Sequence, residues 1–468
     1  MNVIPGDKSY LPFSSFAVYS SNGLDARAQG AAFFRATDAT ARNFAGDATK
    51  LYRLVALAWD DASRLVGGVY ATGSDEGWQF TKFGVRVIAV NGTDVMQVFN
   101  IDSATDFSAL GGSSPTGPRF VTVVRDFVVV GRTAADRQLV QWSAIDNATD
   151  WVTSASTMAD SQTLPDGDWI QGIIGGEYGI IFQERAIRRM TFIGSPVIFQ
   201  FDKISNELGV TISGSIAAFG DRAFFCDRSG FYMLISGAQI VPIGERRVNT
   251  YFWDDLDQSY FPRVTAAVDP VNHVYAISYP GSGHSAGTPN KMLVYNWVTD
   301  RWSHAEPGAL DMIYSGASQT GYTLAGLDAV SATLGGLPFP LGSPVWAGIG
   351  RPLFAAFNTA FRLGYFNATP LAATVDTTEA QLFPGRRAYV RAVRPLVDGG
   401  VPTVAIGSRN LQTAAVSFGS DVAANGNGVC RMRSNARYHR ARIKVPASAA
   451  WDHIVGVDDV DASPGWGR

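Results

Sequence analysis

Ile101-Asp102-Ser103-Ala104-Thr105-Asp106-Phe107 recurs 44 residues further along the chain as Ile145-Asp146-Asn147-Ala148-Thr149-Asp150-Trp151. A weaker third copy is Val298-Thr299-Asp300-Arg301-Trp302. An apolar, β-prone run comes directly before each copy. A period of about 40–45 residues is the length of one four-stranded propeller blade, so the repeat predicts a β-propeller.

The polar and aromatic side chains of the repeat have an expected structural role. Asp and Thr side chains bond nearby backbone N–H groups and hold tight turns. The aromatic residue that follows would pack between neighbouring blades, where it buries a large apolar area. Ligand stacking by the tryptophans is the alternative role. The predicted blade-turn residues are Asp102, Thr105, Asp106, Asp146, Thr149, Asp150, Trp151, Trp297, Thr299, Asp300 and Trp302.

The composition of the 468-residue chain also favours an all-β fold. Apolar residues make up 46% of it, which is enough for a large core. Charged residues make up 17%, against a usual ~25%, and there are 49 glycines, which indicates many turns and little charged helical surface. From Leu51 onward, short β-rich runs such as Leu65–Tyr70 alternate with turn residues at spacings of about 8–12 residues. Grouped in fours, these runs predict about five or six blades.

Three regions are expected along the chain. Residues 1–50, rich in Ala, Ser and Gly, are interpreted as an N-terminal arm that lies along another surface, such as a neighbouring subunit, or as a frayed terminus. Residues 51–350 would form an irregular β-propeller that ends in a Gly/Pro-rich stretch at 331–350. Residues 351–468 would form an Arg-rich C-terminal β domain of the sandwich type.

The sequence carries no signature of a catalytic, cofactor or metal site. The five histidines lack the spacing of metal ligands, and there is neither a Gly-x-Ser-x-Gly elbow nor a Walker-type phosphate loop. We therefore predict that the chain is not an enzyme and needs no cofactor. The alternative is a propeller glycosidase or depolymerase, or a non-catalytic module that binds a host glycan. Its candidate residues are Asp75-Glu76, Asp254-Asp255 and Glu245-Arg246-Arg247.

The two cysteines and the N-terminus indicate where the chain is made. Cys226 and Cys430 are expected to be buried thiols, and whether they ever pair is left open. The first residues have neither the basic nor the apolar segment of a secretion signal. No apolar run approaches the ~20 residues needed to span a bilayer. We expect synthesis in a reducing compartment and no membrane insertion.

The strongest interaction signal is a basic stretch near the C-terminus. Between Gln381 and Lys444, basic residues exceed acidic ones by nine, whereas in residues 1–380 acidic residues exceed basic ones by nine. The stretch could contact nucleic-acid phosphates, dock on an acidic face of a partner or a neighbouring copy, or form a solvated surface. We favour docking, because arginine is enriched at protein interfaces. The candidates are Arg386, Arg387, Arg391, Arg394, Arg409, Arg431, Arg433, Arg437, Arg440 and Arg442.

Several longer motifs, in this order, resemble the tail hub or nozzle proteins of short-tailed bacteriophages (podoviruses), a group that includes packaged-DNA stabilisation proteins. The likeness runs from about Lys50 to the C-terminus, and the order of the motifs carries it more than any one of them. The motifs are Trp142–Trp151, Ile174–Met190, Asp227–Tyr232, Ile243–Asn249, Val294–Trp297 and Arg433–Arg440.

This resemblance implies a structural virion protein. Its copies would form a ring, expected to be a hexamer, that lies below the portal and adaptor rings. The ring would continue the DNA exit channel, contact packaged DNA without sequence preference, close the channel until ejection, and anchor fibres or a tail tip. The protein would be made in the host cytoplasm and end in the phage tail. No catalytic residues carry over, because such proteins act by assembly.

Overall fold

The computed structural model describes residues 1–318, 327–328, 330–346 and 352–466. The chain divides into two units. Unit 1 contains Met1–Phe16, Met292–Pro307 and Asn367–Arg468, and unit 2 contains Ala17–Lys291 and Gly308–Phe366. Strands make up 47% of the structure and helices 5%, which confirms the all-β prediction. Among the described residues, no helix is long and apolar enough to cross a membrane.

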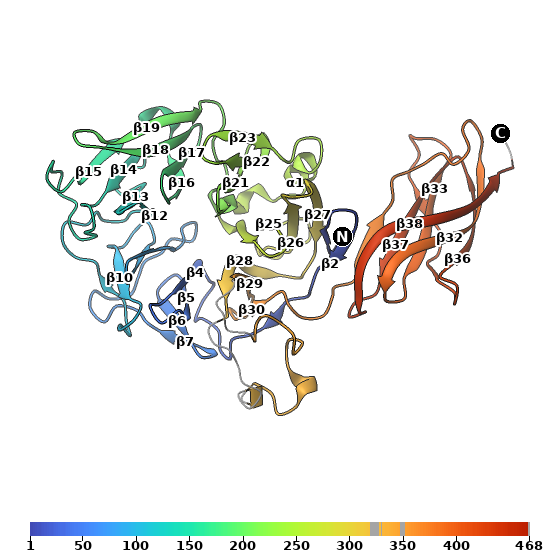
Figure 1. Cartoon of the computed structure of the whole chain (residues 1–468), viewed down its shortest axis with the longest axis horizontal. Helices are drawn as coiled ribbons and strands as arrows, with labels where there is room; N and C mark the ends of the chain where they lie inside the picture. The colour runs from blue at the N-terminus through green and yellow to red at the C-terminus, as the bar shows by residue number, and fades with distance from the viewer. Residues whose placement is uncertain (319–326, 329, 347–351, 467–468) are drawn as a thin grey trace. The chain divides into compact units, whose positions relative to one another are not determined.

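Seven four-stranded antiparallel sheets give the described part of the chain a propeller-like architecture (Figure 1). Six follow the chain in simple up-and-down order. The first three are β4 (Gly30–Arg35), β5 (Ala41–Gly46), β6 (Leu51–Val55) and β7 (Ala58–Asp61); β8 (Gln79–Phe83), β9 (Arg86–Val90), β10 (Gln97–Asn100) and β11 (Ser108–Ala109); and β12 (Phe120–Val124), β13 (Phe127–Gly131), β14 (Leu139–Trp142) and β15 (Asp160–Thr163).

The next three sheets repeat this order. They are β16 (Ile170–Ile174), β17 (Gly179–Gln183), β18 (Ile187–Gly194) and β19 (Ile198–Ser205); β20 (Ala217–Phe219), β21 (Arg222–Asp227), β22 (Gly230–Ile235) and β23 (Gln239–Pro242); and β24 (Thr265–Asp269), β25 (Val274–Tyr279), β26 (Lys291–Asn296) and β27 (Arg301–Ala305). A short helix, α1 (Asn249–Asp255), and the 3-10 turn η3 (Gln258–Arg263) separate the last two of them.

The first strands of these sheets surround a central space in unit 2. Strands β4, β8, β12 and β16 contact one another in turn, and so do β20, β24, β28 (Leu310–Ala317) and β4. Apolar side chains fill the gaps between successive sheets. One such cluster joins Phe44 and Leu51 of the first sheet to Val87 and Phe99 of the second.

The seventh sheet corrects the predicted N-terminal arm. Its order is β28-β29-β30-β3, in which β29 (Pro352–Asn358) and β30 (Leu363–Tyr365) are joined by β3 (Ala17–Val18) from the beginning of the chain. Ala17 pairs with Tyr365, and Val18 pairs with Gly364. Residues 1–50 are therefore not a separate arm, because β3, β4 and β5 are built into the sheets of unit 2.

The predicted boundary at 331–350 and the predicted blade number also need correction. The described part of this Gly/Pro-rich stretch, 331–346, lies between β28 and β29 of one sheet, and 347–350 lie outside the described residues. Unit 2 continues to Phe366. Seven sheets form instead of five or six, because strands from before residue 51 and after residue 350 complete the first and last of them.

All three copies of the repeat occupy the same place in their sheets. They connect the third strand to the fourth: β10 to β11, β14 to β15, and β26 to β27. Asparagines that the prediction overlooked hold these connections. Asn100 Oδ1 accepts from the N–H of Asp102 (3.1 Å), and Asn147 Oδ1 from that of Thr149 (3.1 Å).

The aromatic residue that ends each of the first two copies is buried between two sheets. Phe107 lies in the cluster shared by the first and second sheets. Trp151 packs among residues of the second and third sheets, and its Nε1 donates to the Ala148 carbonyl at 2.7 Å. In the third copy, Trp302 packs on Tyr295 with a ring-centroid distance of 4.8 Å.

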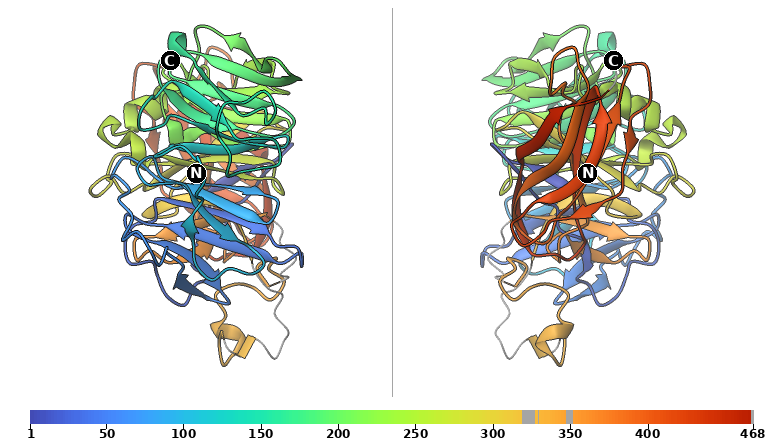
Figure 2. Two further views of the ribbon diagram at one scale, coloured as in Figure 1. Left: turned by 90° about the vertical axis from the view of Figure 1, so that its left-hand side faces the viewer. Right: turned by 90° about the vertical axis from the view of Figure 1, so that its right-hand side faces the viewer.

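Unit 1 is built on two five-stranded sheets (Figure 2, right). One has the order β1-β2-β38-β32-β36, and the other has the order β31-β37-β33-β34, with β35 paired to β33. Residues from both sheets, such as Val390, Val404 and Ile443, share one apolar core. The strands are β1 (Val3–Pro5), β2 (Tyr10–Pro12), β31 (Ala373–Asp376), β32 (Ala388–Gly399), β33 (Thr403–Arg409), β34 (Ser417–Phe418), β35 (Val422–Ala423), β36 (Cys430–Ala436), β37 (Tyr438–Val445) and β38 (Trp451–Pro464).

Candidate functional site

The ten arginines predicted as interface or DNA-facing residues all lie in unit 1, and they fall into two groups. Five are engaged with carboxylates of the same unit: Arg391 with Asp461 (2.8 Å), Arg394 with Asp458 (3.9 Å), Arg409 with Glu379, and Arg440 (3.9 Å) and Arg442 (2.7 Å) with Asp376. The Arg409 guanidinium holds the pKa of the Glu379 carboxyl below its usual range. The guanidinium groups of these five arginines are therefore already paired within unit 1.

The other five have no carboxylate within ion-pair distance in the described part of the chain, and we call them the arginine surface. Arg431 and Arg433 alternate with inward-facing residues along β36, an outer strand of its sheet, so both point to solvent. Nearby, the Tyr389 ring stacks on Trp466 (5.3 Å between centroids), which is 73% exposed. The arginine surface consists of Arg386, Arg387, Arg431, Arg433 and Arg437.

Sequence reasoning missed a second surface, the loop Arg64–Tyr70 between β7 and β8. The predicted strand Leu65–Tyr70 does not form, because Gly67 (φ 109°) and Gly68 (φ 72°) turn the chain back on itself. Leu65, Val66 and Val69 are 84%, 87% and 72% exposed. We call this segment the apolar loop.

The base of the apolar loop is rigidly held. The Arg64 side chain donates to the carbonyls of Gly68 (3.0 Å) and Val69 (3.2 Å) and pairs with Asp94 at 2.9 Å. That ion pair is largely buried, at 9% and 12% side-chain exposure. The Arg64 guanidinium also lies over the Tyr70 ring, 4.5 Å from its centroid. These contacts fix the base of the loop beneath its apolar tip.

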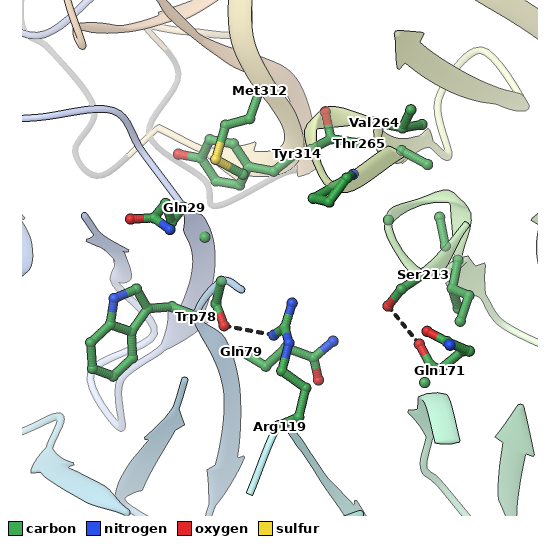
Figure 3. A pocket seen from close by; sticks show the side chains of 18 of the residues that line it. Gln29, Trp78, Gln79, Arg119, Gln171, Ser213, Val264, Thr265, Met312 and Tyr314 are labelled. Atoms are coloured by element: carbon green, nitrogen blue, oxygen red, sulfur yellow. Dashed lines mark hydrogen bonds between the residues drawn. The ribbon is translucent and has the colours of Figure 1, made fainter. Parts of the chain in front are cut away.

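A third feature is a cavity of about 860 Å³ lined by the inner strands of unit 2 (Figure 3). Arg119 reaches into it, donating to the Gly77 carbonyl at 2.6 Å and pairing with Glu76. Arg132 is 3.6 Å from the same carboxylate, and its guanidinium lies 5.5 Å from the Trp169 ring centroid. We call this space the central cavity.

The carboxylates considered for a glycosidase do not converge. Asp75 and Glu76 line the central cavity. Asp255 is bound instead by Lys291 Nζ (2.8 Å) and Ser282 Oγ (2.7 Å), in a part of unit 2 that does not line it. Glu245 is an exposed residue beside Arg246 (3.7 Å). Of these candidates, only Asp75 and Glu76 line a space that a ligand could enter.

Cys226 and Cys430 are both buried, and both are free thiols, as the sequence predicted. Burial raises the pKa of the Cys226 thiol well above its ordinary value, so this thiol stays protonated at neutral pH.

No protein-family model and no curated protein matches the chain. Among solved structures, it is similar to two crystal structures of the extracellular domain of BT4673 from B. thetaiotaomicron, described as a one component and a hybrid two component system. Both are 11% identical, with TM-scores of 0.45 and 0.47, and each match covers 90% of this chain and 48% of the other, so this chain spans about half their length. A chain of the mitotic checkpoint complex matches at 8% identity and a TM-score of 0.40, over 70% of this chain and 88% of that chain. Likenesses of this size carry no argument about function.

Proposed function

We propose that this chain is a structural subunit of the tail of a short-tailed bacteriophage, the hub or nozzle ring. Copies of the chain form a ring, with six as the proposed number, that continues and closes the DNA exit channel below the portal and adaptor rings. The ring also anchors fibres or the tail tip. The order of sequence motifs supports this proposal, together with two surfaces that are suited to assembly.

The apolar loop is the observation that carries the proposal. Three aliphatic side chains on one rigid loop are exposed to water, and such clustered exposure marks an interaction surface. Each side chain contributes about 1.5–3 kcal/mol when it is fully buried. Because Arg64 fixes the loop in advance, little conformational entropy is lost when a partner covers it. A neighbouring copy of the chain is the proposed partner.

The arginine surface would serve the same assembly. Its five guanidinium groups are free of carboxylates within the described residues of their own chain, and residues 1–380 carry a net negative charge. Opposite charge on a neighbouring copy would orient the subunits as the ring forms. Contact with packaged DNA through phosphates is the second use of this surface. In this function, unit 2 is an irregular β-propeller and unit 1 a β-sandwich-like domain.

Assembly of the purified full-length chain, measured by mass photometry, tests the proposal. The wild-type chain should form a closed ring, and Leu65→Ser combined with Val66→Ser should weaken assembly by ~100-fold or more. Val271→Ser is the matched control, since Val271 is 62% exposed but lies in a different loop. A monomer for the wild type, or rings that persist in the double variant, would contradict the role of the loop. Turnover of a host polysaccharide, lost on carboxylate substitution, would support the glycosidase alternative instead.

A further inference from the structure

The first strands of the first five sheets in unit 2 begin at one common end and finish at the other. Hydrogen bonds join neighbouring first strands at matching ends, and the last of them is drawn in Figure 3. They run from Trp78 N–H to the Gln29 carbonyl (2.8 Å), from Arg119 to the Gly77 carbonyl (2.6 Å), from Gly176 N–H to the Val123 carbonyl (2.9 Å) and from Ser213 Oγ to the Gln171 carbonyl (2.6 Å). Because each sheet is antiparallel, the connections from its first to its second strand and from its third to its fourth strand lie at the same end.

The charges on these ten connections are almost all of one sign. The connections carry eight acidic residues and one basic residue, Arg125. The connections at the opposite end, between β5 and β22, carry nine acidic and seven basic residues. We call the end with the ten connections the acidic face of unit 2. Its acidic residues are Asp38, Asp102, Asp106, Asp126, Asp146, Asp150, Glu177 and Asp221.

Exposed apolar side chains also belong to the acidic face. Each of them lies in one of the ten connections or at the strand end beside it, and each is 38–61% exposed. Apolar surface that leaves water on association favours binding. The acidic face therefore offers a partner both an apolar contact area and one sign of charge. The apolar residues are Val55, Val85, Ile145, Val152, Ile193, Val197 and Phe219.

Half of the acidic residues lie on connections of the third and fourth sheets. Arg125 N–H donates to the Gly176 carbonyl (2.8 Å), and Asp146 N–H donates to the Asp126 carbonyl (2.9 Å), so these connections lie side by side. The Arg125 guanidinium is already paired with Glu177 at 2.6 Å. The carboxylates of Asp126 and Asp146 are exposed and have no ion-pair partner among the described residues. These two carboxylates are available to cations of another chain.

We infer that, in the proposed ring, the acidic face of one copy docks on the arginine surface of the next copy, an inference that rests on the proposed function. Carboxylates without a cation then meet guanidinium groups without a carboxylate, and such charge-assisted pairs are strong and directional. The Tyr389–Trp466 stack beside the arginines offers apolar area to the apolar side chains of the acidic face. Because two different surfaces meet, the contact is head-to-tail, which is the kind of interface that closes into a ring.

Charge reversal on each surface, with rescue by mixing, tests this interface. Asp126→Lys with Glu177→Lys reverses two charges of the acidic face, and Arg431→Glu with Arg433→Glu reverses two charges of the arginine surface. Each double variant of the full chain should form rings at least tenfold more weakly than wild type at low salt, measured by mass photometry, because like charges then face each other. An equimolar mixture of the two double variants should form rings again, because every contact in an alternating ring pairs opposite charges.

Glu207→Lys with Asp254→Lys is the matched control, since both residues are exposed and lie outside the acidic face. This control variant should assemble as wild type does. Thermal unfolding of each variant should match that of wild type, because the reversed side chains lie on the surface. Asp126→Asn with Glu177→Gln replaces the acidic-face variant if that variant unfolds, and it should weaken assembly several-fold.

The outcomes separate this interface from the ring itself. Wild-type chains that stay monomeric would contradict the proposed function and this interface together. Wild-type rings with rings of equal strength in either double variant, or no recovery in the mixture, would overturn this interface alone. If only the arginine variant lost its rings, the arginine surface would have another occupant, and its pairing with the acidic face would be wrong.

Discussion

The connection Ile101–Phe107 and the apolar loop Arg64–Tyr70 both contain apolar side chains. These side chains are buried in the connection but exposed in the loop. Both are turns in unit 2, and both contain apolar as well as polar residues. In the connection, Ile101 and Phe107 are buried in the cluster between the first two sheets. In the loop, Leu65 and Val66 point to water while Arg64 and Tyr70 hold the base.

The buried side chains of the connection stabilise the fold, whereas the exposed side chains of the apolar loop are available to a partner. In both close copies of the connection, the aromatic side chain packs against a neighbouring sheet. The apolar loop occurs once, is fixed at its base by an ion pair, and adds nothing to the core at its tip. Substitutions in the connection should therefore lower the stability of the chain. Substitutions at the tip of the apolar loop should leave stability nearly unchanged but weaken assembly.

The largest expected effect is on stability, from Phe107→Ala. Phe107 is buried and packs against Phe44 (5.8 Å between centroids) and Phe99 (5.1 Å). Loss of the ring leaves a cavity, so we expect the free energy of unfolding to fall by about 3–5 kcal/mol. Urea denaturation followed by tryptophan fluorescence measures it. A loss below about 1 kcal/mol would show that the connection does not hold the two sheets.

Loss of the Arg64 side chain, which holds the base of the apolar loop, should have the next largest effect on stability. Arg64→Ala leaves the largely buried Asp94 without its ion-pair partner, so we expect a loss of about 3 kcal/mol. Cleavage within 65–69 by a protease should also become faster. Arg42→Ala is the control, because its pair with Asp38 is exposed and 3.6 Å long. Unchanged proteolysis would mean that Arg64 does not order the loop.

Trp151→Phe tests the second copy of the repeat with a smaller change, because an aromatic ring is kept. The substitution removes the bond from Nε1 to the Ala148 carbonyl, which is buried, and reduces the packed volume. We expect a loss of about 2 kcal/mol in unfolding free energy. Differential scanning calorimetry would register it as a lower Tm. An unchanged Tm would assign the stabilisation to other contacts of this turn.

The smallest effect on stability should come from the tip of the apolar loop. Leu65→Ser with Val66→Ser should change the free energy of unfolding by less than about 0.5 kcal/mol, because both side chains are exposed. Urea denaturation of the dissociated chain checks this. A large loss of stability would place these side chains in the core of the monomer.

Much of the fold could be predicted from the sequence, since the repeat and the short β-rich runs depend on local patterns. The strands Ala17–Val18 and Gly30–Arg35 escaped prediction, because they are short or rich in small residues and pair with distant segments. The arginine cluster was visible in the sequence, but its division into paired and free residues was not. That division depends on which carboxylates the folded strands bring near, such as Asp461 beside Arg391.

The apolar loop was misinterpreted for a related reason. Leu65, Val66, Val69 and Tyr70 have the composition of a strand, and the two glycines between them decide otherwise. The outward direction of the tip depends on Arg64 reaching back to its own loop, a contact that no periodicity indicates.

Electron microscopy of the purified wild-type chain with an adaptor ring tests the central claim most directly. We predict class averages in which six copies of the chain form a closed ring around a central channel. In these images, the apolar loop of each copy should lie against its neighbour. Single chains in the presence of the adaptor, or rings in which the apolar loops remain in solvent, would contradict the account.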